Sequence, residues 1–268
     1  MFNLLCMDLH RLFKTRSFFM TLGVMAALIV LVNLMAVTMS DPEFLDAMEA
    51  GGAEISQYDR QEGELIRGMS QLQLAYEVFS SGFLLLVTGI GLSVFFGQDY
   101  TCGFVKNIWS AQPVRWLCVL EKAAFAGLYS ALLTALAVAL ALLSPACMGF
   151  SARPDPLPDI LLYAFLLWLP NWAFGLMALF MVLLSRHSTL GILMSLASGL
   201  GLTAALSQIL PHLLHLPYPS PYFLSSVVRS QCLPRPYPPQ IQTVVLCSAG
   251  WGLAYLLCSL FTAEKQDI

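Results

Sequence analysis

Long apolar stretches separated by short polar segments dominate the sequence. Six windows are almost free of charged residues over about 20 positions or more, the length that an α-helix needs to cross a hydrocarbon core about 30 Å thick. We expect transmembrane helices over residues 18–40, 78–98, 120–144, 160–185, 188–210 and 241–262. The pattern predicts an all-α polytopic membrane protein in which residues 1–268 form one transmembrane domain.

Composition supports this prediction and excludes two broad classes. The chain is 58% hydrophobic and only 11% charged, whereas soluble proteins average about 25% charged residues. So few charges cannot coat a water-soluble globule of this size. The net charge of -3 and the absence of a basic block argue against nucleic-acid binding, because displacing counterions from phosphates requires clustered Lys and Arg.

The first 16 residues have the pattern of an amphipathic helix. One side of the predicted helix carries the polar residues Asp8, Arg11 and Lys14. Apolar residues recur mainly at spacings of three and four, at Phe2, Leu5, Leu9, Leu12 and Phe13. Such a helix beside a span is expected to lie in the membrane interface, with its basic residues near anionic lipid headgroups. The alternative is a simple N-terminal extension of the first span.

Lysine and arginine placement predicts the orientation. With a cytoplasmic N-terminus, that side carries eight basic residues, which are Arg11, Lys14, Arg16, Lys106, Arg115, Lys122, Arg186 and Lys265, and the other side carries Arg60, Arg67, Arg153, Arg229 and Arg235. Because basic loops resist translocation, both termini are predicted to be cytoplasmic.

Two segments on the outer side are distinctive. Residues 41–77 are acidic, which either attracts a cationic substrate or simply provides a solvated loop. Their second half has helical spacing. Residues 208–240 hold eight of the fifteen prolines, and apolar residues recur between them. Proline excludes a continuous helix, so this segment is expected to form a short helix or a re-entrant element at the outer face.

Candidate sites for chemistry are few. His212 and His215 are three residues apart and could supply two metal ligands, but a stable site needs three or four, and no third ligand is evident. We therefore expect no metal site. The sequence contains no Gly-x-x-x-x-Gly-Lys-Ser/Thr phosphate loop, so ATP hydrolysis would have to come from a partner. Cys147 and Cys232 are expected to be free thiols, with a disulfide between them as the alternative.

Small residues recur at every fourth position of the fifth expected span, at Gly191, Ser195 and Gly199. This spacing permits close approach of a second helix. Packing within the chain is the first interpretation, and a homodimer seam is the second.

The segment 99–116, between the second and third spans, is the only sizeable loop on the predicted cytoplasmic side. Apolar residues at helical spacing predict a short amphipathic helix that ends before Pro113, and they are Phe104, Val105, Ile108 and Trp109. Exposed aromatic residues on such a helix are typical of a docking element for a soluble partner.

At these residues the chain resembles the membrane subunit of ATP-binding-cassette exporters of the type 2 (type V) family, including short six-span permeases of the peptide-antibiotic immunity kind. The resemblance rests on Asp99-Tyr100, Gly103, Lys106, Pro113-Val114-Arg115 and Lys122, and on Asp8-x-x-Arg11-x-x-Lys14 as the family's interfacial helix. Asp99 stands where glutamate is more usual, and Phe104 where threonine is common.

The resemblance implies a plasma-membrane permease that is not itself an enzyme and carries no cofactor. It would form a homodimer or pair with a similar permease, and it would dock on a separately encoded ATPase that holds ATP and Mg. The implied ATPase-coupling residues are Asp99, Tyr100, Gly103, Phe104, Lys106, Ile108, Trp109, Pro113 and Arg115. The implied substrate is a hydrophobic or amphipathic peptide, drug or lipid.

The alternative function is a secondary carrier, or a ligand-binding membrane module, that works without an ATPase. Carriers place polar groups near the middle of the membrane. Asn33 and Asn171 are the best candidates for such groups.

Overall fold

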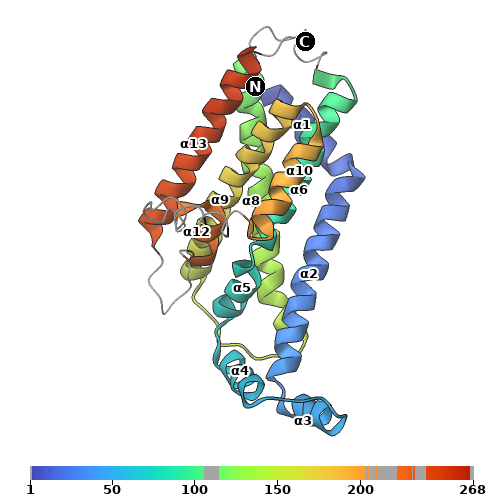
Figure 1. Cartoon of the computed structure of the whole chain (residues 1–268), viewed down its shortest axis with the longest axis vertical. Helices are drawn as coiled ribbons and strands as arrows, with labels where there is room; N and C mark the ends of the chain where they lie inside the picture. The colour runs from blue at the N-terminus through green and yellow to red at the C-terminus, as the bar shows by residue number, and fades with distance from the viewer. Residues whose placement is uncertain are drawn as a thin grey trace.

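The computed structural model describes residues 2–105, 115–202, 205, 209, 222–230, 232 and 240–265, and these are mostly helical, with no β-strand among them. The all-α prediction is confirmed. Figure 1 shows the helices, which are α1 (Phe2–Lys14), α2 (Arg16–Ser40), α3 (Pro42–Ala50), α4 (Gln57–Gly68), α5 (Gln71–Ser80), α6 (Phe83–Thr101), α8 (Arg115–Cys147), α9 (Leu157–Ser185), α10 (Ser188–Gly199), α12 (Leu224–Ser230) and α13 (Ile241–Lys265).

Within the described residues, five helices are long and apolar enough to cross a membrane: α2, α6, α8, α9 and α13. The second expected span, 78–98, starts later than predicted, because Gly82 adopts a φ of 80° and separates α5 from α6. The fifth, 188–210, differs more. α10 has 12 residues, about 18 Å of helix, and a turn at Leu200 and Gly201 follows it.

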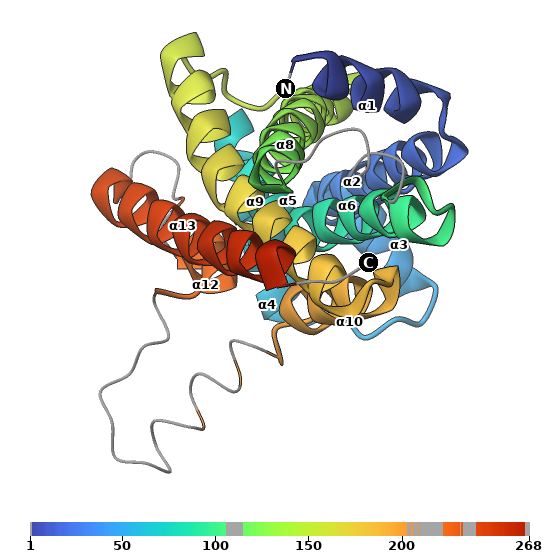
Figure 2. The same cartoon turned by 90° about the horizontal axis from the view of Figure 1, so that it is seen from above.

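The ends of the bundle carry different elements. Figure 1 shows α1 and the end of α13 at one end of the long axis, and α3 and α4 at the other. Seen from above in Figure 2, α1 lies across its end of the bundle, beside α8. The amphipathic pattern correctly predicted α1, in which Leu12 is buried while Phe13 and Lys14 are exposed.

The seam between α6 and α10 is built from small residues of both helices. A Cβ on Gly97 would lie 2.6 Å from Ser188 Cβ, and one on Gly199 would lie 2.6 Å from Leu86 Cβ. The two helices are antiparallel, and the facing pairs are Gly97 with Ser188, Ser93 with Gly191, Gly89 with Ser195, and Leu86 with Gly199. The predicted stripe Gly191, Ser195 and Gly199 therefore packs within the chain, which is the first of the two interpretations.

The acidic segment 41–77 is mostly helical rather than a loop. It forms α3, α4 and α5, and the last two begin with capping boxes at Ser56 and Ser70. α4 packs across the end of α2, where a Cβ on Gly63 would lie 2.6 Å from Met39 O. The backbone N–H of Leu72 donates to Asp155 Oδ2 at 2.8 Å, which ties α5 to the connection between α8 and α9.

Candidate functional site

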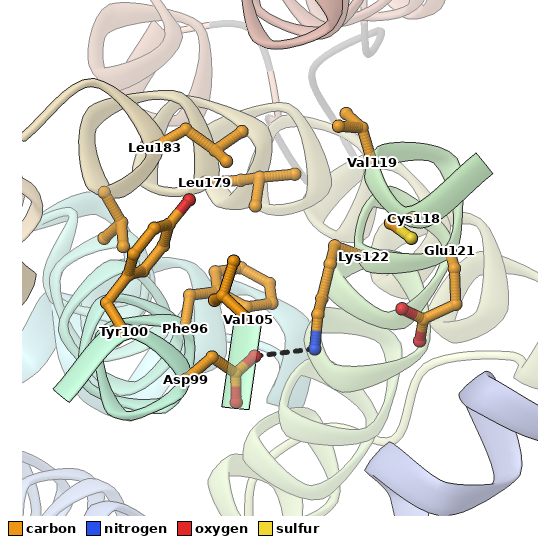
Figure 3. Close-up of a pocket in the computed structure, with 11 residues that line it drawn as sticks. Phe96, Asp99, Tyr100, Val105, Cys118, Val119, Glu121, Lys122, Leu179 and Leu183 are labelled. Carbon is orange, nitrogen blue, oxygen red and sulfur yellow. Dashed lines mark ion pairs between the residues drawn. The ribbon is translucent and has the colours of Figure 1, made fainter. Parts of the chain in front are cut away.

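Four charged side chains from three helices meet where α1 crosses the bundle. Arg11 of α1 contacts Asp99, near the end of α6, at 2.6 Å, and it contacts Asp8 of its own helix at 3.4 Å. Lys122 of α8 contacts Asp99 at 2.7 Å and also forms an ion pair with Asp8. Figure 3 shows Asp99 and Lys122 facing each other between α6 and α8. We call these four residues the α1 charge cluster.

The two carboxylates of the cluster are shielded from solvent. The side chains of Asp8 and Asp99 are 0% and 4% exposed. Arg11 lies over the rings of Phe95 and Phe104, at 4.9 and 5.0 Å from their centroids. Removing a charge from water costs several kcal/mol, and only close contact with opposite charges offsets this cost. Here each carboxylate faces both cations, so the pairing holds α1 against α6 and α8.

Glu121, next to Lys122, adds a third carboxyl group. It is 2% exposed, and its Oε1 has no hydrogen-bond partner among the described residues. In Figure 3 it lies on the side of Lys122 away from Asp99. It lines, with Asp99 and Lys122, a cavity of about 40 Å³. Pockets for small molecules measure about 300–1,000 Å³, so this cavity is too small for a substrate. The cluster is suited to joining helices.

The predicted coupling residues do not all lie on one surface. Asp99 is buried in the cluster, Tyr100 is partly buried beside the small cavity, and Phe104 packs on Arg11. Arg115 begins α8 and donates to the carbonyl oxygens of Ala263 and Glu264 in α13, both at 3.5 Å. The others lie outside the described residues, and they are Lys106, Ile108, Trp109 and Pro113.

Gly103 follows α6 with a φ of 68°, and no atom of the described residues lies within 4 Å of where its Cβ would be. The glycine thus serves a turn, because other residues rarely adopt this conformation. Within the part of the chain that the structure describes, no neighbour packs closely on it.

The predicted interfacial residues separate into two groups. Lys14 is exposed, as a residue that contacts lipid headgroups must be. Asp8 and Arg11 instead point into the bundle and pair with Asp99 and Lys122. The helical wheel correctly placed them on one side of α1, but that side is covered by α6 and α8.

The cysteines and histidines considered in the sequence analysis do not form a site among the described residues. Cys147 and Cys232 are free, as expected. His212 and His215 lie outside the described residues, which include no group of three or more potential metal ligands. Sequence reasoning missed Glu121, although a Glu-Lys pair at the start of an otherwise apolar helix was a visible signal. It also missed the small residues of α6 that receive α10.

Searches against models of protein families and against curated protein sequences return no match to this chain.

Proposed function

We propose that this chain is the membrane-spanning permease subunit of an ATP-binding-cassette exporter, driven by a separately encoded ATPase. The observation that carries the proposal is the α1 charge cluster. Its residues come from three distant segments, at Asp8 and Arg11, at Asp99, and at Lys122. These are residues on which the sequence resemblance rests, and the fold brings them into direct contact.

The cluster also offers a route for mechanical coupling. α6 ends and α8 begins at this end of the bundle, and residues 102–114 connect them. A partner that pushes on this connection would displace the ends of both helices. α1 would follow, because Arg11 and Lys122 bridge carboxylates on either side. Export then requires a bundle with two alternative arrangements, between which the ATPase shifts the population.

Co-purification tests the proposal. We expect the tagged chain, isolated from its native membrane in mild detergent, to bring with it a protein that has a phosphate loop and hydrolyses ATP. Trp109→Ala should weaken this association, and Tyr58→Ala, an exposed aromatic at the opposite end, should not. Full retention of the ATPase by a chain carrying both Trp109→Ala and Asp99→Ala would contradict the coupling assignment.

The proposal also places the α1 end in the cytoplasm. In a chain without native cysteines, Glu54→Cys at the α4 end should react with an impermeant maleimide in intact cells. Lys106→Cys should react only after permeabilisation. The reverse pattern would overturn the orientation.

A secondary carrier is the second candidate, and the short α10 favours it. Carriers build their sites from interrupted helices near the middle of the membrane, and α10 stops after 12 residues. Asn171, in the adjacent α9, is fully buried, and its Oδ1 has no hydrogen-bond partner among the described residues. Uptake by the chain alone in liposomes, driven by a proton or sodium gradient, would favour the carrier over the exporter.

A further inference from the structure

A large cavity lies at the end of the bundle opposite the charge cluster. It is an open cavity of about 520 Å³ between α2, α4 and α5, and we call it the α4 pocket. This volume falls within the range of small-molecule sites. Its lining combines apolar side chains of α2, α4 and α5 with three carboxylates, which are Asp59, Glu62 and Glu77.

The three carboxylates are not neutralised by a described basic side chain. Arg60, which neighbours Asp59, points instead to α3, where it pairs with Asp46 at 2.9 Å and Glu49 at 2.6 Å. The Ser56 hydroxyl and backbone N–H both donate to Asp59 and lower the pKa of its carboxyl group. The pocket therefore carries negative charge at neutral pH.

The buried side chain of Asn33 is a second feature, independent of the carboxylates, that points to a ligand. It lines the pocket, yet only 1% of its surface is exposed. Its Nδ2 donates to Ser144 Oγ at 2.6 Å, whereas its Oδ1 accepts no hydrogen bond from the described residues. Asn33 precedes Met39 by six residues, about 9 Å along α2, so this acceptor lies well inside the bundle from the end that α4 covers.

We propose that the α4 pocket binds an amphipathic organic cation that also carries a hydrogen-bond donor. The positive charge would face Asp59, Glu62 and Glu77. The apolar body would contact the wall of α2, which includes Val32, Met35 and Ala36. The donor would reach Asn33 Oδ1. Each part of the ligand thus matches a feature that the pocket presents.

That such a cation is also the transported substrate rests on the proposed exporter function. Binding itself does not, because the pocket is built by one chain and lies at the end opposite the ATPase-coupling segment. A binding assay on the chain alone therefore separates the two proposals. If the chain binds the cation but no ATPase, the exporter proposal is wrong and the binding site stands. If the chain binds an ATPase but not the cation, only the binding site is wrong.

Ethidium is a suitable probe, since it combines a permanent positive charge, a flat apolar body and two arylamine donors. Its fluorescence anisotropy would be followed on the full chain in phosphatidylcholine nanodiscs, with empty nanodiscs as the blank. We expect saturable binding that weakens as NaCl is raised, because salt screens the carboxylates.

Charge-matched variants test the assignment. The double variant Glu62→Gln/Glu77→Gln removes two carboxylates that line the pocket. The double variant Glu54→Gln/Glu64→Gln removes two carboxylates of the same acidic segment that are likewise exposed but do not line it. The first should weaken ethidium binding about tenfold or more, and the second less than twofold. Ala36→Phe, which fills the pocket without changing charge, should also abolish binding. Equal affinity of both double variants, unchanged affinity of Ala36→Phe, or no saturable binding would overturn the proposal.

Discussion

The two ends of the molecule use the same arrangement of charges in opposite surroundings. At the α1 end, Arg11 lies between Asp8 and Asp99, whose side chains are 0% and 4% exposed. At the α4 end, Arg60 lies between Asp46 and Glu49, whose side chains are 64% and 55% exposed. The shortest contact of each arginine is 2.6 Å. Distance therefore does not distinguish the two groups, but burial does.

This difference assigns different roles to the two ends. Exposed ion pairs contribute about 0–1 kcal/mol, because water and salt screen them. A buried group is different, because removal of one partner leaves an unpaired charge in a medium of low polarity. The α1 end is thus suited to holding helices in a fixed relation. The α4 end, where no described basic side chain pairs with the carboxylates around a large cavity, is suited to contact with a solute.

The largest effect is expected from Lys122→Met. This change removes one of the two cations that face both Asp8 and Asp99, and it should destabilise the protein by about 3–5 kcal/mol. The fraction of monodisperse protein after heating in detergent is the measurement. Lys14→Met, an exposed change on the same end, should have almost no effect. If both variants keep the same fraction of monodisperse protein after heating, the cluster does not hold the helices together.

An intermediate effect is expected from Gly191→Leu in the seam between α10 and α6. A Cβ at this position already meets the side chain of Ser93, so a larger side chain must push the helices apart, at a cost of about 1–3 kcal/mol. Gly250→Leu in α13 is the control, since its Cβ would meet no atom of the described residues within 4 Å. If Gly191→Leu instead changed only the oligomeric mass, the stripe would be a dimer seam.

The smallest effect is expected from Arg60→Ala. Its two ion pairs are exposed, so we expect a change of about 0.5 kcal/mol or less in the same melting assay. Arg11→Ala provides the direct comparison and should be several times more destabilising. Similar losses for the two variants would remove the distinction between the ends.

The sequence predicted the elements better than their contacts. Hydropathy located the five long helices because uncharged windows of about 20 residues are a direct consequence of bilayer thickness. It could not foresee where α10 ends, because the residues around Gly201 remain apolar beyond the turn. A single glycine at positive φ changes the path of the backbone without changing hydropathy.

The candidate site shows a similar limit. Periodicity placed Asp8 and Arg11 on one face of a helix, but it carries no information about what covers that face. Only the fold reveals that α6 and α8 do so, and that Arg11, which was expected at lipid headgroups, pairs internally with Asp99. Likewise, the acidic composition of 41–77 was visible, but the cavity beneath it depends on how α4 packs on α2.

Reconstitution in liposomes distinguishes an ATP-driven exporter from a carrier. We expect that the chain alone neither hydrolyses ATP nor accumulates a solute against its gradient, and that both activities appear with its ATPase. Replacement of Gly103, at a φ of 68°, by valine should reduce this ATP turnover, because valine would strain a turn in the connection on which the ATPase would act. ATP-insensitive uptake by the chain alone, driven by a proton or sodium gradient, would contradict the exporter account.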